Sequence, residues 1–229
     1  CSSDLKIYEI FLTEQLVLLE NNTIGLGKKK DCQNRSVVTT PTEIVKYMVD
    51  KTLSKVCEGK TPSEILNISV ADIACGSGIF LEEAFAYLQD YCVQWYICNG
   101  QTDHLIETGI DLYKLPLQEK KDILCSCIYG IDIDIHAVEV AKFSLLIKLI
   151  EDETAPSVSE VVPILPDLGD NIQFGNSLVS QTELNGISGA NRQMMEIAPF
   201  DWSTINNGCG FDVIIGNPPY VNTEGMHAL

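Results

Sequence analysis

The chain has 229 residues, a mass of 25.3 kDa and 45% hydrophobic residues, which is enough for one domain with a real core and an appended segment. It contains no run of about 18 apolar residues and no basic stretch leading into an apolar one, so neither a membrane span nor a secretory signal is predicted. The net charge of −17 argues against a nucleic-acid-binding surface, which should be basic. If nucleic acid is the substrate, its basic contact surface is expected in another part of the protein.

The cysteines favour a reducing, cytoplasmic compartment over a disulfide scaffold. Nine is an odd number, and the chain is neither small nor preceded by a visible signal peptide. No Cys-x-x-Cys pair occurs and only three histidines are present, so no metal site is predicted. The chain begins at Cys1 and ends at Leu229, nine residues past Tyr220, and so reads as a piece of a longer protein.

Residues 1–60 are expected to form an amino-terminal helical segment. Apolar residues recur at roughly helical spacing between Asp4 and Glu20, with Ser3 as a candidate N-cap. A polar loop is expected over residues 21–36. A second helix should open at Thr40-Pro41-Thr42-Glu43, because proline is favoured in the first turn of a helix.

Residues 61–229 are expected to form an α/β core, because short apolar strands alternate with helices. Strands are predicted over residues 69–74, 127–133, 172–174 and 211–215, and helices over 79–91 and 137–149. An insertion with a mixed helical signal occupies residues 92–126. Such alternation predicts a parallel, doubly wound sheet, whose ligands bind at the carboxyl ends of the strands.

The first predicted strand ends in a glycine-rich turn, Cys75-Gly76-Ser77-Gly78. Glycines allow a backbone to approach a ligand closely. The third glycine of the dinucleotide-binding pattern is missing, so the turn does not imply a pyrophosphate. On its own, this pattern is explained equally well by a tight turn without a ligand.

Polar residues also follow the second and third predicted strands. Asp132 could accept two hydrogen bonds from ribose hydroxyls, and Ile133 could pack on an adenine face. Asp134 is better explained as the N-cap of the next helix. In Gly175-Asn176-Ser177, the amide of Asn176 could reach the amino group of an adenine, although a plain turn explains the pattern nearly as well.

The fourth predicted strand ends in Asn217-Pro218-Pro219-Tyr220. The two prolines stop both strand and helix, which allows the carbonyl of Pro218 to point into a cleft. The side-chain oxygen of Asn217 is a second acceptor, and the ring of Tyr220 can stack on a flat substrate. Two acceptors and an aromatic face suit an exocyclic amino group on a ring, which makes Asn217, Pro218 and Tyr220 the candidate catalytic residues.

Taken in order, these motifs resemble those of the gamma-class N6-adenine DNA methyltransferases of bacterial restriction–modification systems, including large enzymes that combine modification with restriction or phage defence. The likeness covers about residues 36–221 and includes the Thr40-Pro41 motif upstream of the glycine-rich turn. Two positions depart from the family pattern, Ile73, where proline is frequent, and Asn176, where aspartate is frequent. The later strands of that family and its target-recognition domain are not found here.

The resemblance implies a Rossmann-like class I fold and S-adenosylmethionine as the cofactor. It implies direct methyl transfer to an adenine flipped out of double-stranded DNA, which would be bound largely through regions beyond this chain. It is also compatible with a fused or partner nuclease. The residues implied in cofactor binding are Thr40, in a motif that would close over the cofactor, and Asp72, Ala74, Gly76, Gly78, Asp132, Ile133, Asn176, Ser177 and Asn217.

Other functions fit parts of the pattern. Protein-glutamine N5 methyltransferases and RNA methyltransferases also carry Asn-Pro-Pro-Tyr, because a side-chain amide is likewise a planar nitrogen. The Thr-Pro motif and the insertion after the first core helix favour DNA. A third interpretation is a fragment that binds the cofactor without catalysis, whereas no convincing carboxylate–lysine cluster of a nuclease is found in the sequence.

Overall fold

The computed structural model describes residues 14–18, 24–28, 40–154, 161–180 and 198–218. The chain forms two compact units, one made of residues 1–40 and 217–229 and the other of residues 41–216. None of the helices in these described ranges is long and apolar enough to cross a membrane.

The first unit contains an antiparallel hairpin of β1 (Glu14–Leu18) and β2 (Ile24–Lys28). The helix predicted from Asp4 to Glu20 is therefore wrong over residues 14–18, and residues 4–13 lie outside the described residues. The physical reason is visible in the sequence, where two short runs rich in leucine, valine and isoleucine flank a polar stretch. This is a hairpin pattern, and the helical spacing came from residues farther upstream.

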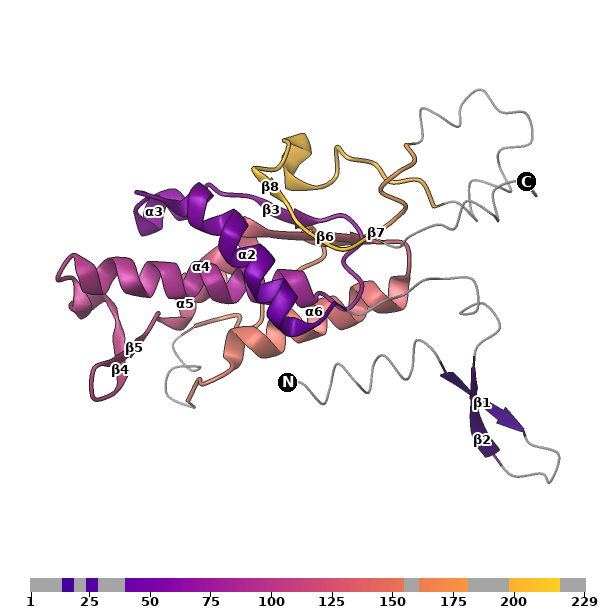
Figure 1. Ribbon diagram of the computed structural model, residues 1–229, viewed down its shortest axis with the longest axis horizontal. Helices are drawn as coiled ribbons and strands as arrows, with labels where there is room; N and C mark the ends of the chain where they lie inside the picture. Colours follow the sequence, from indigo (N-terminus) through magenta and orange to yellow (C-terminus); the bar gives the residue numbers. More distant parts are fainter. Residues whose placement is uncertain (1–13, 19–23, 29–39, 155–160, 181–197, 219–229) are drawn as a thin grey trace. The chain divides into compact units, whose positions relative to one another are not determined.

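The second unit is built on a four-stranded parallel sheet in the order β7-β6-β3-β8 (Figure 1). Its strands are β3 (Val70–Asp72), β6 (Ile128–Asp132), β7 (Ile172–Phe174) and β8 (Val213–Ile214). The predicted parallel α/β fold is confirmed. Successive strands step outward from β3 on one side, and β8 returns to its other side. The strand order therefore reverses at β3, and ligands of such sheets bind outside the strand ends at this point.

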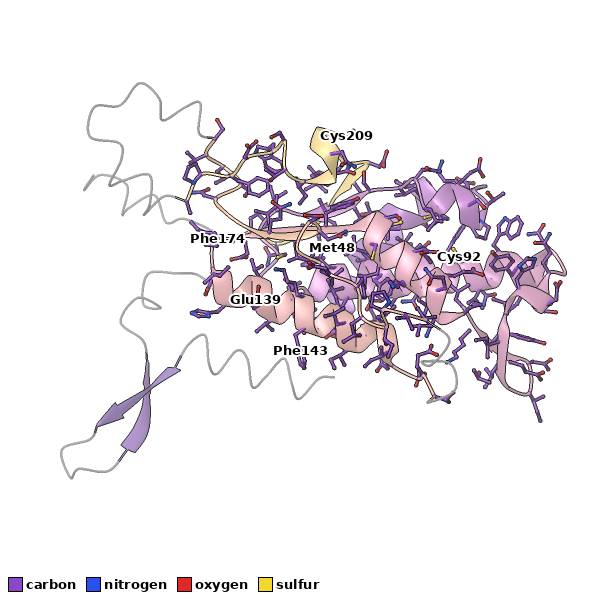
Figure 2. All side chains as sticks on the ribbon, turned by 180° about the vertical axis from the view of Figure 1, so that it is seen from behind. Met48, Cys92, Glu139, Phe143, Phe174 and Cys209 are labelled. Atoms are coloured by element: carbon purple, nitrogen blue, oxygen red, sulfur yellow. The ribbon has the colours of Figure 1, made fainter. Side chains whose placement is uncertain are left out.

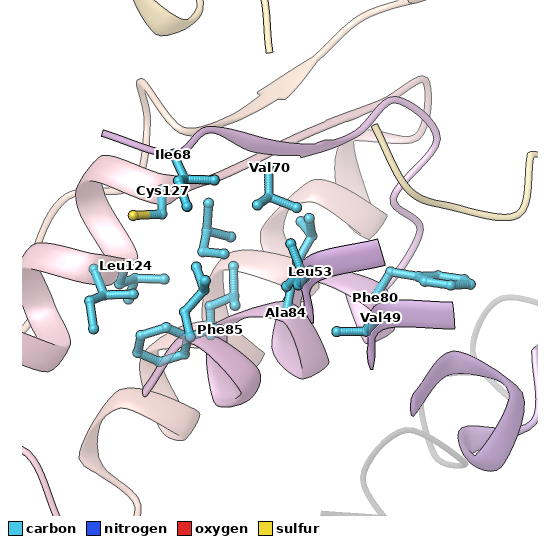
Figure 3. Packing of buried hydrophobic residues seen from close by; sticks show 14 of the residues in the cluster. Val49, Leu53, Ile68, Val70, Phe80, Ala84, Phe85, Leu124 and Cys127 are labelled. Atoms are coloured by element: carbon cyan, nitrogen blue, oxygen red, sulfur yellow. The ribbon is translucent and has the colours of Figure 1, made fainter. Parts of the chain in front are cut away.

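Helices pack on one face of the sheet (Figure 1). Their bounds are α2 (Thr42–Cys57), α3 (Pro62–Ile65), α4 (Ile79–Cys98), α5 (Leu117–Cys127) and α6 (Ile135–Ile150). The helix predicted after Pro41 is confirmed as α2. The inner sides of these helices meet the strands in a single apolar core, in which Leu53, Ala84 and Phe85 are fully buried (Figure 3). Phe143, in contrast, projects from α6 into solvent (Figure 2).

The insertion between β3 and β6 is ordered. After α4 come a short 3-10 turn, η2 (Thr102–His104), and a hairpin of β4 (Ile106–Gly109) and β5 (Leu112–Lys114), and α5 then leads into β6. A buried charge cluster connects these parts. One oxygen of Glu153 lies 2.6 Å from the ammonium of Lys120 and 3.0 Å from that of Lys114, with the glutamate side chain only 1% exposed.

The second face of the sheet is covered by the chain segment that leads into β8. Phe200 and Ile205 from this segment are buried against Ala71, Tyr129 and Ile131. The segment includes one 3-10 turn, η3 (Asn206–Gly208). Because β3 and β6 are covered on both faces, they are continuous apolar runs without the alternation of a half-exposed strand.

Gly130 is a tightly packed position in β6. A Cβ there would lie 2.7 Å from Leu81 Cδ1 and 3.1 Å from Cys75 Sγ. We expect Gly130→Ala to lower the free energy of unfolding by about 1–3 kcal/mol, the usual cost of overpacking a dense core. Urea denaturation followed by circular dichroism measures the loss. Gly210→Ala is the matched control, because nothing lies within 4 Å of the added methyl group, and an equal loss in both variants would contradict the prediction.

Candidate functional site

Two aspartates lie at the carboxyl ends of neighbouring strands in the second unit. Asp72 ends β3 and Asp132 ends β6, and the parallel pairing of the two strands brings their ends to one edge of the sheet. The turns that follow both strands, and the turn after β7, gather at the same edge. This is the edge at which the sequence predicted a ligand site.

The glycine-rich turn wraps around Asp132. The backbone N–H of Gly76, which has a φ of +53°, donates to Asp132 Oδ2 at 2.7 Å. Gly78 has a φ of +91° and is the N-cap of α4, and a Cβ on it would lie 3.1 Å from Ala141 Cβ on α6. The two glycines therefore meet different needs: both adopt a left-handed backbone, and Gly78 also allows α4 to approach α6 closely.

Asp132 keeps capacity for a ligand. Its second oxygen accepts the N–H of Asp134 at 2.8 Å, and the backbone of Ile133 also bonds to the carboxylate. A carboxylate has about four acceptor sites, so the three backbone bonds leave some capacity. Burial raises the pKa of Asp132 above its ordinary value. Asp134 in turn accepts the N–H of His136 at 2.9 Å, which confirms it as the N-cap of α6. Ile133, between the two aspartates, is 47% exposed and can offer an apolar face.

Asp72 is much more deeply buried than Asp132. Its side chain accepts the N–H of Ala74 at 3.0 Å, and the residue is 2% exposed. Burial raises the pKa of Asp72 to about 7; the Ala74 N–H lowers it, and the nearby charge of Asp132 adds to the increase. Gly216 closes over this carboxyl group, since a Cβ at that position would lie 2.7 Å from Asp72 Cγ. Gly216 is not among the predicted site residues, and its only signal in the sequence is its place directly before Asn217.

Cys75 lies within the glycine-rich turn and is 4% exposed. Its N–H donates to the carbonyl of Ile131 at 2.9 Å, which ties the turn to β6. Burial raises the pKa of the Cys75 thiol well above its ordinary value, and the carboxylates of Asp132 and Asp72 act in the same direction. A thiol in this state is a packing residue and a poor nucleophile.

The turn after β7 fastens the site from the other side. Asn176 Oδ1 accepts the N–H of Leu178 at 3.1 Å, so its side chain supports the local turn. The hydroxyl of Ser177 donates to the carbonyl of Ile73 at 2.7 Å. Ser177 thus links the turn after β7 to the turn after β3. Contact of Asn176 or Ser177 with a cofactor stays a prediction.

Two predicted site residues meet in the first unit. Asn217 Nδ2 donates to Thr40 Oγ1 at 3.0 Å, across 177 residues of sequence. This bond engages the amide nitrogen and leaves Asn217 Oδ1 as an acceptor. Pro218 is exposed, and Tyr220 lies outside the described residues. Among the described residues of both units, no group of three or more His, Cys, Asp or Glu side chains could hold a metal ion.

Residues 126–229 match the Eco57I restriction-modification methylase family. The whole chain is 44% identical over 230 aligned positions to the type II restriction enzyme and methyltransferase RM.Eco57I of Escherichia coli, and covers 22% of that protein. Residues 126–229 are thus similar to restriction-modification methylases. The predicted resemblance to the methyltransferases of restriction–modification systems is thereby confirmed.

A second relative of this chain comes from Methanocaldococcus jannaschii. The putative type II restriction enzyme and methyltransferase RM.MjaORFECS2P of Methanocaldococcus jannaschii is 34% identical over 122 residues, which are 53% of this chain and 9% of that protein. Among solved structures, a nuclease-deletion mutant of the Type ISP restriction-modification enzyme LlaGI in complex with a DNA substrate mimic aligns with a TM-score of 0.45 and 18% identity, covering 80% of this chain and 13% of that one. This chain therefore spans a small part of each of these longer proteins.

Proposed function

We propose that the chain carries the cofactor site and acceptor motif of an S-adenosylmethionine-dependent DNA adenine-N6 methyltransferase of a restriction–modification system. The observation that supports this most is the pair of carboxylates at the ends of β3 and β6, enclosed by a glycine-rich turn, in a chain similar to restriction-modification methylases. Double-stranded DNA, a target-recognition domain and a fused or partner nuclease are the partners that this function implies. The proposed compartment is the cytoplasm.

The residues present fit S-adenosylmethionine. Asp132 has acceptor capacity left beside its backbone bonds for a ribose hydroxyl, and exposed Ile133 can pack against the adenine ring. Asp72 is a buried carboxyl group suited to the cationic methionine end, since a nearby positive charge favours its ionised form. Gly76 and Gly78 keep the turn free of side chains, so the backbone can approach the bound molecule.

The chemistry proposed for Asn217, Pro218 and Tyr220 is to orient the acceptor. When bound, S-adenosylmethionine would supply an electrophilic methyl group. The adenine N6 lone pair is delocalised into the ring, and hydrogen bonds from the amino group to Asn217 Oδ1 and the Pro218 carbonyl would make it available. The Thr40 hydroxyl supports this role, because it holds the amide nitrogen of Asn217 and so fixes which end of the amide faces the substrate.

Presenting the base requires it to leave the duplex, which costs a few kcal/mol. Stacking on Tyr220 would return roughly 1–3 kcal/mol. The net charge of −17 indicates that contacts to the DNA backbone are made by regions other than this chain. These regions would also supply the recognition of sequence.

Calorimetric titration of S-adenosylmethionine into the chain tests the cofactor site. We expect Asp132→Ala to weaken binding by roughly 10- to 100-fold, because hydrogen bonding to the ribose is lost. Asp134→Ala is the matched control, since it removes the N-cap of α6 but leaves Asp132 in place. Equal affinity of the parent and Asp132→Ala would contradict the site.

A second assay separates the acceptors. Transfer of a labelled methyl group from S-adenosylmethionine is measured with the natural full-length protein on adenine-containing duplex DNA, on RNA and on a glutamine-containing protein substrate. Label on N6 of DNA adenine supports the proposal. Label on RNA would instead indicate an RNA methyltransferase, and label on a glutamine side chain would indicate a protein-glutamine N5 methyltransferase.

A further inference from the structure

A reciprocal hydrogen-bond cluster joins the chain just before β3 to the chain just before β8. Asp212 Oδ2 accepts both the backbone N–H of Ser69 at 2.8 Å and its hydroxyl at 3.0 Å. In return, the N–H of Asp212 donates to Ser69 Oγ at 3.1 Å. Ser69 is only 7% exposed, although the two residues are 143 positions apart in sequence.

The strand next to this cluster is short. β8 has two residues, which pair with Val70 and Ala71 of β3, and the bonds at its ends include Val213 N–H to the Ser69 carbonyl at 3.0 Å and Ile215 N–H to the Ala71 carbonyl at 2.9 Å. Val213 and Ile215 are each 5% exposed, whereas Ile214 between them is 61% exposed. Burial of this one face opposes a one-residue slip, and the Ser69–Asp212 cluster adds side-chain hydrogen bonds to the short ladder.

A shift by one residue would be costly at the other end of β8. Gly216 lies against the buried Asp72 carboxyl group, where even a single Cβ does not fit. A slip in either direction would bring Ile215 or Asn217, both with side chains, to that position. The register thus decides which residue lies over Asp72 and where the chain leaves the sheet as Asn217-Pro218.

We propose that Ser69 and Asp212 are positioning residues for methyl transfer. Their cluster, which we call the register clamp, fixes β8 on β3 and so delivers Asn217 at the end of the strand. The role of Asn217 in this inference rests on the proposed function. The clamp itself rests on the hydrogen bonds between Ser69 and Asp212. None of the hydrogen bonds described for either residue goes to Asp72 or Asp132.

The test compares Asp212→Ala with Asp212→Asn, which keeps an oxygen able to accept both bonds from Ser69. In Asp212→Ala we expect amide hydrogen exchange of Val213 and Ile215 to accelerate at least about tenfold, because β8 opens more often. In the natural full-length protein, kcat for methyl transfer should fall at least about tenfold, while the Kd for S-adenosylmethionine changes less than about twofold. Asp212→Asn should recover most of the exchange protection and of kcat.

Asp201→Ala is the matched control. Asp201 also accepts a backbone N–H and a hydroxyl from one serine, Ser203, but the two are neighbours in the same loop. This variant should leave Ile215 exchange and kcat unchanged. Unchanged exchange at Ile215 in Asp212→Ala would overturn the clamp, and unchanged kcat would overturn the positioning role. A parent protein that transfers no methyl group would instead overturn the proposed function and the role with it, while the exchange result would still decide whether the clamp exists.

Discussion

Asp72→Asn is expected to make the fold more stable at pH 8 and at the same time to weaken S-adenosylmethionine binding. Asp72 is almost fully buried, and burial raises its pKa to about 7 from an ordinary value of 3.8. At pH 8 the folded protein must therefore hold a buried, ionised carboxylate. Asparagine has nearly the same shape and can still accept the Ala74 N–H, so the variant should gain up to about 4 kcal/mol in the free energy of unfolding.

The pH dependence gives this prediction its sign. The folded state keeps the Asp72 proton up to about pH 7, whereas the unfolded state loses it near pH 4. Between these values the folded state binds more protons, so the contribution of Asp72 to stability falls as the pH rises and is lowest above pH 7. The gain from Asp72→Asn should therefore be largest at pH 8 and shrink steadily towards pH 4.

Urea denaturation at several pH values, together with calorimetric titration of the cofactor at pH 8, measures both effects. Asp170→Asn is the matched control, because it makes the same change in net charge at an exposed position before β7. A stability difference for Asp72→Asn that did not depend on pH would show that the buried charge is not its cause. Unchanged cofactor affinity would show that the methionine end is held elsewhere.

Glu153→Gln is expected to be among the most destabilising single changes in the second unit. The Glu153 carboxylate is the counter-ion of Lys120, whose side chain is 7% exposed, and it also pairs with Lys114. The neutral amide would leave the Lys120 ammonium buried without a negative partner. Breaking a buried pair in this way typically costs about 3–5 kcal/mol of unfolding free energy.

A second substitution tests this explanation. Lys120→Met in the Glu153→Gln background should recover most of the loss, because the unpaired charge is then removed and an apolar side chain takes its place. Glu139→Gln is the control, since Glu139 forms an exposed pair with Lys142 on α6, and such pairs contribute about 1 kcal/mol or less. Denaturation midpoints of the parent, the Glu153→Gln and Lys120→Met single variants and the double variant measure the cycle. If Lys120→Met stabilises the Glu153→Gln variant by no more than it stabilises the parent, the unpaired charge is not the cause of the loss.

The core strands were predictable because each ends in a local signal. The third predicted strand has the expected bounds, Ile172–Phe174. The N-cap at Asp134 could also be predicted, because aspartate is a favoured residue at the start of a helix. The length of α4 was underestimated: it runs to Cys98, since nothing before Asn99-Gly100 breaks a helix. The hairpin within the insertion was missed because its strands are only 4 and 3 residues long, although Gly109 and Asp111 at its turn are residue types common in turns.

The contacts that shape the candidate site could not be read from sequence. Gly216 against Asp72 and Ser177 against Ile73 join residues more than a hundred positions apart. Local patterns identify which residue types stand at strand ends, but only the packed sheet decides which of them touch. The sequence therefore predicted Asp72 and Asp132 as site residues. It could not predict that Asp72 is almost fully buried, whereas Asp132 is less buried and accepts backbone hydrogen bonds from Gly76 and Asp134.

The buried thiol of Cys75 can report how often the glycine-rich turn is displaced. It lies inside the glycine-rich turn with a raised pKa, so an alkylating reagent can reach and modify it only while that turn is transiently displaced. The alkylation rate of this one sulfur would therefore count such displacements directly. A molecule bound at the turn would slow the reaction in proportion to its occupancy, so the alkylation rate of Cys75 would measure ligand occupancy at this edge of the sheet.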